Sequence, residues 1–301
     1  MSLLSSPQGT PERVWSVVAG LHALGGDTDR ATFNALLNPG YIKDGEEVRA
    51  KDLLAGDASN AASALGLIDL ARDQVKLGEG YSVTDYAALA DHVHDYLVDL
   101  PSEDIEATLL EAYAWLAAEC DRVGNLGWFY DWPQKDFAEK AGREGRSDTS
   151  FKGSINPTNI TAWRRWLTFI GLGVPLPLHQ TPELPVPTIR LARELERAST
   201  SGEISAGAEI TAEAFLAFIA KHMPYLDRGR LFVAACQRIG HPTPARQASP
   251  LLSLALRDLH DEGTIRLALA GDAGTHIRLT PDPAHKFQAF TTVIVTPETA
   301  S

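Results

Sequence analysis

The chain has 301 residues, of which 44% are hydrophobic and 22% charged, and its formal net charge is -12. This composition is ordinary for a soluble globular protein and leaves ample material for two or three compact domains. The acidity excludes nucleic-acid contact over the whole surface, because an acidic bulk repels phosphate at long range, so any such contact must be local.

Targeting signals are missing from the sequence. No run of 18 apolar residues occurs, so no transmembrane helix and no membrane partner are expected. The first 15 residues lack a basic region followed by a long apolar run, so they do not resemble a signal peptide. Cys120 and Cys236 stand alone without a CxxC pair, which favours small buried hydrophobes in a reducing cytoplasm.

The first third of the chain predicts three helices and a hairpin. Residues 11–25 carry an apolar stripe at helical spacing, and residues 27–40 begin with aspartates and end at Asn-Pro-Gly. A third helix is expected over 60–73, capped by Ser59 or Asn60, and two short strands are expected at 74–77 and 81–83. This order is typical of a winged helix, and we predict one over residues 1–84.

The same order returns near the end of the chain. Helices are predicted over 211–223, 227–240 and 249–263, with Ser249 as the cap of the last and Pro250 at its first position. Residues 264–269 and 275–279 then read as the strands of a hairpin. We therefore predict a second winged-helix domain over 206–301, as a repeat that is weak in sequence and clearer in element order.

Between these domains we expect a helical middle domain over 85–178 and a Pro-rich linker and helix over 179–205. Residues 84–100 and 102–124 carry helical stripes. Residues 125–157 are aromatic, then basic and rich in Gly and Ser, which indicates a short helix and an exposed loop. Five prolines over 174–188 indicate an extended arm. The predicted fold class is mainly α, with winged-helix units at both ends.

The stretch WRRW at 163–166 allows two interpretations. Trp163 and Trp166 share one helical face with Leu167 and Ile170, which favours core tryptophans over platforms for stacked bases. Thr158 or Asn159 is expected to cap this helix, and Gly171 to end it. The adjacent arginines lie about 100° apart around the helix axis and flank the buried stripe.

Residues 135–165 carry seven Lys or Arg against four Asp or Glu. We predict a DNA-facing basic patch in this stretch, with a solvated basic rim as the alternative. The residues of the predicted patch are Lys140, Arg143, Arg146, Lys152, Arg164 and Arg165.

The winged-helix units supply a second set of DNA candidates. A winged helix reads the major groove with its third helix and supports it with basic residues in the wing. The candidates are Arg72 on the first of these helices, Lys76 in its wing, Arg257 on the second helix, and Arg266 and Arg278 on its hairpin. Several carboxylates flank both helices, so we expect weak, non-specific DNA binding, together with protein docking and dimerisation.

Signatures of enzymes are missing: no phosphate-binding GxxxxGK[ST], no GxSxG and no HExxH occurs. On a helix, His92 and His94 point about 200° apart and cannot share a metal ion. A nuclease needs clustered carboxylates and a lysine, a role for which Glu46, Glu47 and Lys51 near Asp44 are candidates, and a polar linker explains them more simply. We expect no catalytic residue, no metal ion and no cofactor.

Three segments carry a resemblance to a known family: TPERVWSVVAGLHALGG at 10–26, LLNPG at 36–40, and NPTNITAWRRWLTFIGLG at 156–173. They resemble the G component of bacterial 7-deazaguanine DNA-modification (Dpd) restriction systems. The resemblance implies an accessory protein of an anti-phage defence assembly that acts with helicase or nuclease subunits. It carries over no catalytic residue.

These observations favour a non-catalytic, cytoplasmic adaptor that docks proteins of the same defence cluster, contacts DNA weakly, and can form a homodimer. Two alternatives stay open. A winged-helix transcription regulator would bind one DNA sequence far better than others, and a divergent nuclease subunit would depend on carboxylates and a metal ion.

Overall fold

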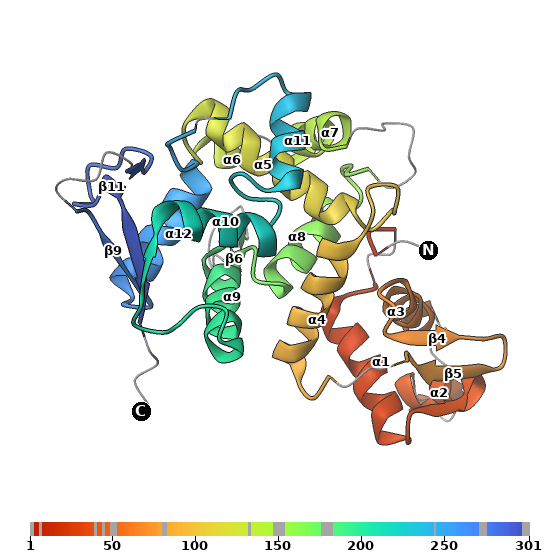
Figure 1. Ribbon diagram of the computed structural model, residues 1–301. Helices are drawn as coiled ribbons and strands as arrows, with labels where there is room; N and C mark the ends of the chain where they lie inside the picture. The colour runs from red at the N-terminus through yellow and green to blue at the C-terminus, as the bar shows by residue number, and fades with distance from the viewer. Residues whose placement is uncertain are drawn as a thin grey trace. The chain divides into compact units, whose positions relative to one another are not determined.

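The computed structural model describes residues 3–5, 8–38, 41–43, 46–48, 53–79, 83–131, 134–146, 154–175, 183–243, 245–270 and 276–296 (Figure 1). The described chain is mainly helical with small antiparallel sheets, as predicted. It divides into two compact units: Met1–Glu106 with Thr158–Ile170, the first unit, and Ala107–Pro157 with Gly171–Ser301, the second unit. Among its described helices, none is long and apolar enough to cross a membrane.

The first unit begins with a helix, a strand, two further helices and two strands. These are α1 (Pro11–Ala23), β1 (Asp27–Asp29), α2 (Arg30–Leu37), α3 (Leu53–Ala64), β4 (Ile68–Leu70) and β5 (Gln74–Leu77). The short strands β2 (Tyr41–Lys43) and β3 (Glu46–Val48) pair between α2 and α3. The predicted stripe of α1 is buried at Val14, Val17, Val18 and Leu21. The three-stranded sheet has the order β1-β5-β4, so its last strand lies in the middle.

The boundaries predicted for the third helix and the hairpin were wrong. Because α3 spans Leu53–Ala64, Ser59 lies inside the helix and does not cap it. The helix ends at Ala64 because Gly66 takes a φ of 67°, which breaks it. The segment expected to continue the helix forms β4, which pairs with β5 in register Asp69↔Lys76. Of the strand expected over 81–83, residues 81 and 82 lie outside the described residues. β1 was not predicted, since its three polar residues carry no apolar alternation.

The first unit also contains α4 (Tyr86–Asp99) and α8 (Ile160–Phe169). Trp163 and Trp166 of α8 are each 1% exposed, which confirms that they are core residues. The indole Nε1 of Trp166 donates to the carbonyl of Gly9 at 3.2 Å, so its one polar atom is satisfied. Asn159 holds the N-cap position without a side-chain capping bond.

The second unit is built around α5 (Thr108–Val123), whose residues from Thr108 to Cys120 are all buried. Helices α6 (Trp128–Asp131) and α7 (Gln134–Glu144) follow it. Trp115 of α5 meets Phe137 of α7 with ring centroids 5.6 Å apart. The exposed loop predicted here was therefore wrong over 134–144, because Phe137, Ala138 and Ala141 give this segment a buried helical face.

The rest of the second unit repeats the strand order of the first. Its elements are β6 (Val174–Pro175), β7 (Glu183–Leu184), α9 (Thr188–Ser201), β8 (Glu209–Thr211), α10 (Ala212–His222), α11 (Arg230–Arg238), α12 (Pro250–Asp261), β9 (Ile265–Ala268), β10 (Ile277–Arg278), β11 (Ala289–Phe290) and β12 (Thr292–Val295). Strands β6 and β7 pair with each other. The three-stranded sheet has the order β8-β12-β9, so its last strand is again central. The three predicted helices are confirmed.

The hairpin predicted at 264–279 was wrong. β9 pairs with β12, and β10 pairs with β11. Leu267 lies opposite Val293 and Ile265 opposite Val295, and all four side chains are buried. Burying these β-branched and aliphatic pairs stabilises the distant pairing over the local one.

Ser249 caps α12 as predicted, and a buried carboxylate holds it. Its Oγ accepts from the backbone N–H of Leu252 at 3.3 Å and donates to Asp227 Oδ2 at 2.6 Å. Its own N–H donates to Asp227 Oδ1 at 2.7 Å. Burial raises the pKa of Asp227 to about 6, the nearby Asp121 carboxylate also raises it, and the bonds from Ser249 oppose the rise.

Replacement of Trp166 by Ala should destabilise the protein by about 3–5 kcal/mol, because the change leaves a large cavity and an unpaired carbonyl at Gly9. Urea unfolding monitored by circular dichroism measures the loss. Leu36→Ala is the matched control, since Leu36 is 56% exposed and its truncation should cost little. Equal stabilities of the two variants would show that Trp166 is not a core residue.

Asp227 should make stability fall as the pH rises from about 4 to 6. The folded state keeps a proton that the unfolded carboxyl, whose ordinary pKa is 3.8, has already released, so stability from this group is lost through that window. The shift corresponds to at most about 3 kcal/mol. Unfolding at several pH values, compared with Asp227→Asn, measures the effect. A difference between the two proteins that does not vary over this window would contradict the raised pKa.

Candidate nucleic-acid interface

The cations predicted at 140, 143 and 152 differ in what the structure shows of them. Lys140 is mostly buried, with a side chain 16% exposed, and it pairs with Glu119 of α5 and with Glu144 at 3.6 Å. Arg143, one turn later, is exposed. Lys152 lies outside the described residues. Of the predicted patch residues in this stretch, Arg143 therefore presents an exposed cation.

Arg146 is buried, and it pairs with Glu111, a second glutamate of α5. Its Nε lies 3.1 Å from Glu111 Oε2, and its guanidinium donates to the hydroxyl of Thr108. Arg146 and Glu111 are each 4% exposed. A buried ion pair resists exchange for a DNA phosphate, because the exchange leaves the buried Glu111 charge without its partner.

The glutamate at 119 also receives Arg122, whose Nε and Nη2 each donate to it at 2.7 Å. These hydrogen bonds and the charge of Lys140 lower the pKa of Glu119, although burial opposes them as the largest single effect. The carboxylate is thus kept ionised and holds both cations at the side of α5.

The two arginines of WRRW differ sharply. Arg164 is 8% exposed, whereas the side chain of Arg165 is 51% exposed and pairs with Glu12 Oε2 at 2.9 Å. Both belong to the first unit, whereas Lys140, Arg143 and Arg146 belong to the second. The predicted patch is therefore divided between two units, and within it Arg143 and Arg165 present exposed side chains.

Arg72 and Lys76 lie on the hairpin of the first unit. Arg72 was predicted on the third helix, but it occupies the turn between β4 and β5 and is exposed. Lys76 is also exposed, and in register it lies opposite Asp27 of β1 and Asp69 of β4. Residues directly opposite in a sheet share one face, so two carboxylates surround the single ammonium group and weaken its attraction for phosphate.

Arg257 of α12 is committed to the protein. It is 4% exposed, and its Nη2 donates to the carbonyls of Thr280 at 2.8 Å and Phe287 at 3.1 Å. Ser253, one turn earlier, accepts from the N–H of Thr280 at 2.8 Å. The segment between β10 and β11 is thereby fastened onto α12.

No face of α12 is open along its first two turns. Residues 250–253 and 255–257 are buried, and the helix packs against α5, α9 and β9. Four consecutive buried residues cover a full turn, so this helix cannot enter a DNA major groove in the described conformation.

Arg266 and Arg278 are the exposed cations of the second unit's strands. Arg266 lies opposite Ile294 of β12, and Arg278 lies opposite Ala289 of β11. Neither faces a carboxylate directly across its strand pair, in contrast to Lys76. They are the predicted residues whose strand partners leave the charge least compensated.

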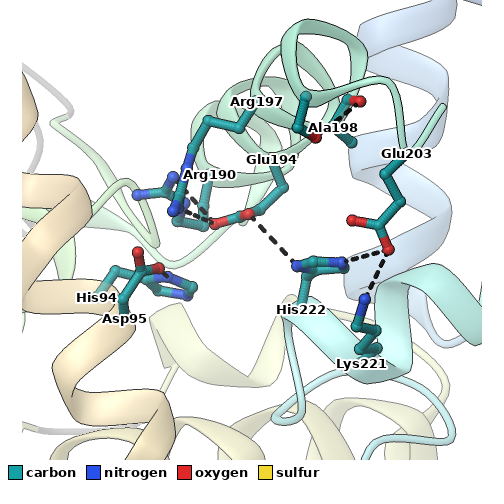
Figure 2. A network of polar contacts seen from close by, with 10 residues as sticks. His94, Asp95, Arg190, Glu194, Arg197, Ala198, Glu203, Lys221 and His222 are labelled. Atoms are coloured by element: carbon teal, nitrogen blue, oxygen red, sulfur yellow. Dashed lines mark hydrogen bonds and ion pairs between the residues drawn. The ribbon is translucent and has the colours of Figure 1, made fainter. Parts of the chain in front are cut away.

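The sequence did not predict a polar network between α9 and α10 (Figure 2). Glu194 is 4% exposed and receives Arg190 at 3.0 Å and Arg197 at 3.3 Å, with His222 Nδ1 at 3.9 Å. Figure 2 also shows Glu203, which receives Lys221 at 2.7 Å and His222 Nε2 at 3.1 Å.

The spacing of Arg190 and Glu194 on one helix face was the available sequence signal for this network. Hydrogen bonds from Lys221 and His222 lower the pKa of Glu203, so its carboxylate stays ionised. The network ties α9 to α10.

The two histidines of α4 differ in their surroundings. His94 is 1% exposed, and its Nδ1 lies 3.3 Å from Asp95 Oδ1. Burial lowers the pKa of His92, which favours its neutral form. Asp44 and Lys51, candidates of the nuclease hypothesis, lie outside the described residues, and of Glu46 and Glu47 only the backbone of β3 is described.

Comparison with known proteins gives one family. A family model described as DpdG-like matches residues 1–273, which is most of the chain. No curated protein and no solved structure matches. The resemblance drawn from the sequence is thereby confirmed.

Arg146→Gln should destabilise the protein by about 3–5 kcal/mol, since it leaves the Glu111 charge buried without its cation. Arg143→Gln, on an exposed position of the same segment, should stay within about 0.5 kcal/mol of the wild type. Urea unfolding of both variants measures the difference. If Arg146→Gln were as stable as Arg143→Gln, Arg146 would not be an internal ion-pair partner.

Proposed function

Since this chain belongs to the DpdG-like family, component G of Dpd DNA-modification systems, we propose that it is a non-catalytic adaptor of such a system. It docks other proteins of the system, among them helicase or nuclease subunits, and contacts DNA weakly and without sequence preference. The observation that carries this proposal is the state of the cations: four of those expected to meet DNA, namely Lys140, Arg146, Arg164 and Arg257, are mostly buried in the protein.

We also propose that both strand-and-helix series are winged-helix units. The supporting observation is the shared strand order. In the first series, β1 follows α1 and pairs with β5, which pairs with β4 after α3; in the second, β8 follows α9 and pairs with β12, which pairs with β9 after α12. The β2–β3 pair of the first series, and α11 and the β10–β11 pair of the second, are additions to this order. Winged helices serve in protein docking as well as in DNA reading.

The features of the two third helices favour docking over base recognition. α12 is buried around its circumference, and in the first unit acidic side chains surround Lys76. Since neither third helix offers an open basic group, DNA contact gains little from counterion release there, and we expect an affinity in the non-specific range of about 10⁻⁴–10⁻⁶ M at physiological salt.

Within this proposal, Arg266 and Arg278 make the duplex contacts of the second unit, and Arg72 makes the contact of the first unit's wing, where Lys76 lies between two carboxylates. Arg143 and Arg165 extend the exposed basic surface of each unit. Lys140, Arg146 and Arg257 act as internal partners of carboxylates and carbonyls instead.

Changing Arg266 and Arg278 together to Gln should weaken duplex binding on every sequence. Each lost phosphate contact lowers the slope of log affinity against log salt by about 0.9, so the double variant should be shallower by about 1 to 2 units. Fluorescence anisotropy with a labelled random duplex at several salt concentrations measures both effects. Lys135→Gln, whose side chain is 73% exposed, is the matched control.

The same variant serves to test the adaptor role. Tagged full-length protein, co-expressed with the other proteins of its system, should retain them in a pull-down whether or not the arginines are changed. A reproducible consensus from a random duplex library would replace the adaptor by a regulator. DNA cleavage that chelation abolishes would replace it by a nuclease subunit, and failure to retain any partner would refute docking.

A further inference from the structure

We propose that the first unit carries a stacking site for unpaired DNA bases, formed by three partly exposed aromatic side chains. These are Trp15 of α1, Tyr86 of α4 and Phe169 of α8, which we call the aromatic ledge. The ring centroids of Trp15 and Tyr86 lie 6.3 Å apart at an interplanar angle of 68°, and those of Tyr86 and Phe169 lie 4.8 Å apart at 50°. Three segments far apart in sequence thus bring their rings into one continuous group.

The ledge is anchored to the core. Phe169 contacts Trp166 at 5.8 Å in an edge arrangement, and Trp166 is 1% exposed and hydrogen-bonded to Gly9. A ring held in place by a packed core loses little conformational freedom when a base stacks on it. The stacking surface is therefore offered by neighbours of the WRRW tryptophans and not by those tryptophans themselves.

The three rings are partly exposed to solvent. Tyr86 is 39% exposed, and Trp15 and Phe169 are half-buried. Partial burial and the charge of Glu12 raise the pKa of Tyr86 to about 12, so its hydroxyl stays protonated at neutral pH and can donate to a base or phosphate oxygen.

A cation stands beside the ledge. Arg165, one helical turn before Phe169, has a side chain 51% exposed, and it pairs with Glu12, whose side chain is 53% exposed. Such exposed pairs contribute little to stability, so Arg165 can exchange its carboxylate partner for a phosphate at small cost. Aromatic faces with an adjacent guanidinium are the elements by which proteins hold single strands.

The chemistry favours a single strand over a duplex. Bases within a duplex already stack on each other, so their faces are closed to a side chain unless the pair is opened. An unpaired strand offers both a free base face for Tyr86 and a flexible phosphate for Arg165. This inference rests on the proposed function only in that the chain meets DNA, and it uses residues other than Arg266 and Arg278.

The test measures binding of the full chain to fluorescein-labelled dT12 and to a 12-base-pair duplex by anisotropy. Tyr86→Ala should weaken dT12 binding about tenfold, as expected for one lost stacking partner, and should leave duplex binding within about twofold. Tyr86→Phe should keep dT12 binding within about twofold, since the ring remains. Leu36→Ala, an exposed apolar residue of the same unit, is the control and should change neither.

Two measurements keep the test decisive if Tyr86→Ala unfolds. Arg165→Gln should lower the salt slope for dT12 by about 0.7, the value for one phosphate on a single strand. Unlabelled dT12 should quench the tryptophan fluorescence of the wild type, and Trp15→Phe should remove most of that change.

Unchanged dT12 binding in Tyr86→Ala and in Arg165→Gln would overturn the ledge. In that case the proposed function would still stand if changing Arg266 and Arg278 to Gln made the salt slope of duplex binding shallower. Loss of a protein partner from Tyr86→Ala, with dT12 binding unchanged, would reassign the ledge to protein docking. If neither DNA form binds at all, the ledge and the DNA part of the proposed function both fail, and the adaptor role rests on the pull-down alone.

Discussion

The second unit depends on one constraint: α5 is buried on every side from Thr108 to Cys120, yet it carries Glu111 and Glu119. A buried carboxylate is costly unless a cation and hydrogen bonds compensate it. Arg146 meets Glu111, and Lys140 with Arg122 meets Glu119. The helix α7 and the chain that follows it are held where these contacts can form, beside the aromatic group of Trp115 and Phe137.

The same constraint decides what the basic stretch can do. Seven Lys or Arg between 135 and 165 suggested an open basic surface, but charges that neutralise internal carboxylates do not attract DNA. Exposed cations are divided between the units: Arg72, Lys76 and Arg165 lie in the first, and Lys135, Arg143, Arg266 and Arg278 lie in the second. The formal charge of -12 repels phosphate at long range, which accords with the proposed role of a protein that its partners bring to DNA.

The two units share a strand order but differ at the third helix. In the second unit, Arg257 and Ser253 fasten the segment between β10 and β11 onto α12, and α5 and α9 cover its other sides. In the first unit, α3 is shorter than the sequence suggested and its hairpin follows sooner, so Arg72 belongs to the turn and not to the helix. One element order thus supports different surfaces, because the packing partners of the third helix differ.

The sequence by itself determined features that depend on near neighbours along the chain. The apolar stripe of α1, the burial of Trp163 and Trp166 and the Ser249 cap all follow from residues within a few turns of each other. Tertiary structure alone decided the pairing of β9 with β12, the engagement of Lys140 and Arg146, and the meeting of Trp15, Tyr86 and Phe169. The physical reason is that helical periodicity and capping are local, whereas strand partners and ion-pair partners are chosen among distant segments by which of them buries the most apolar surface and leaves no charge uncompensated.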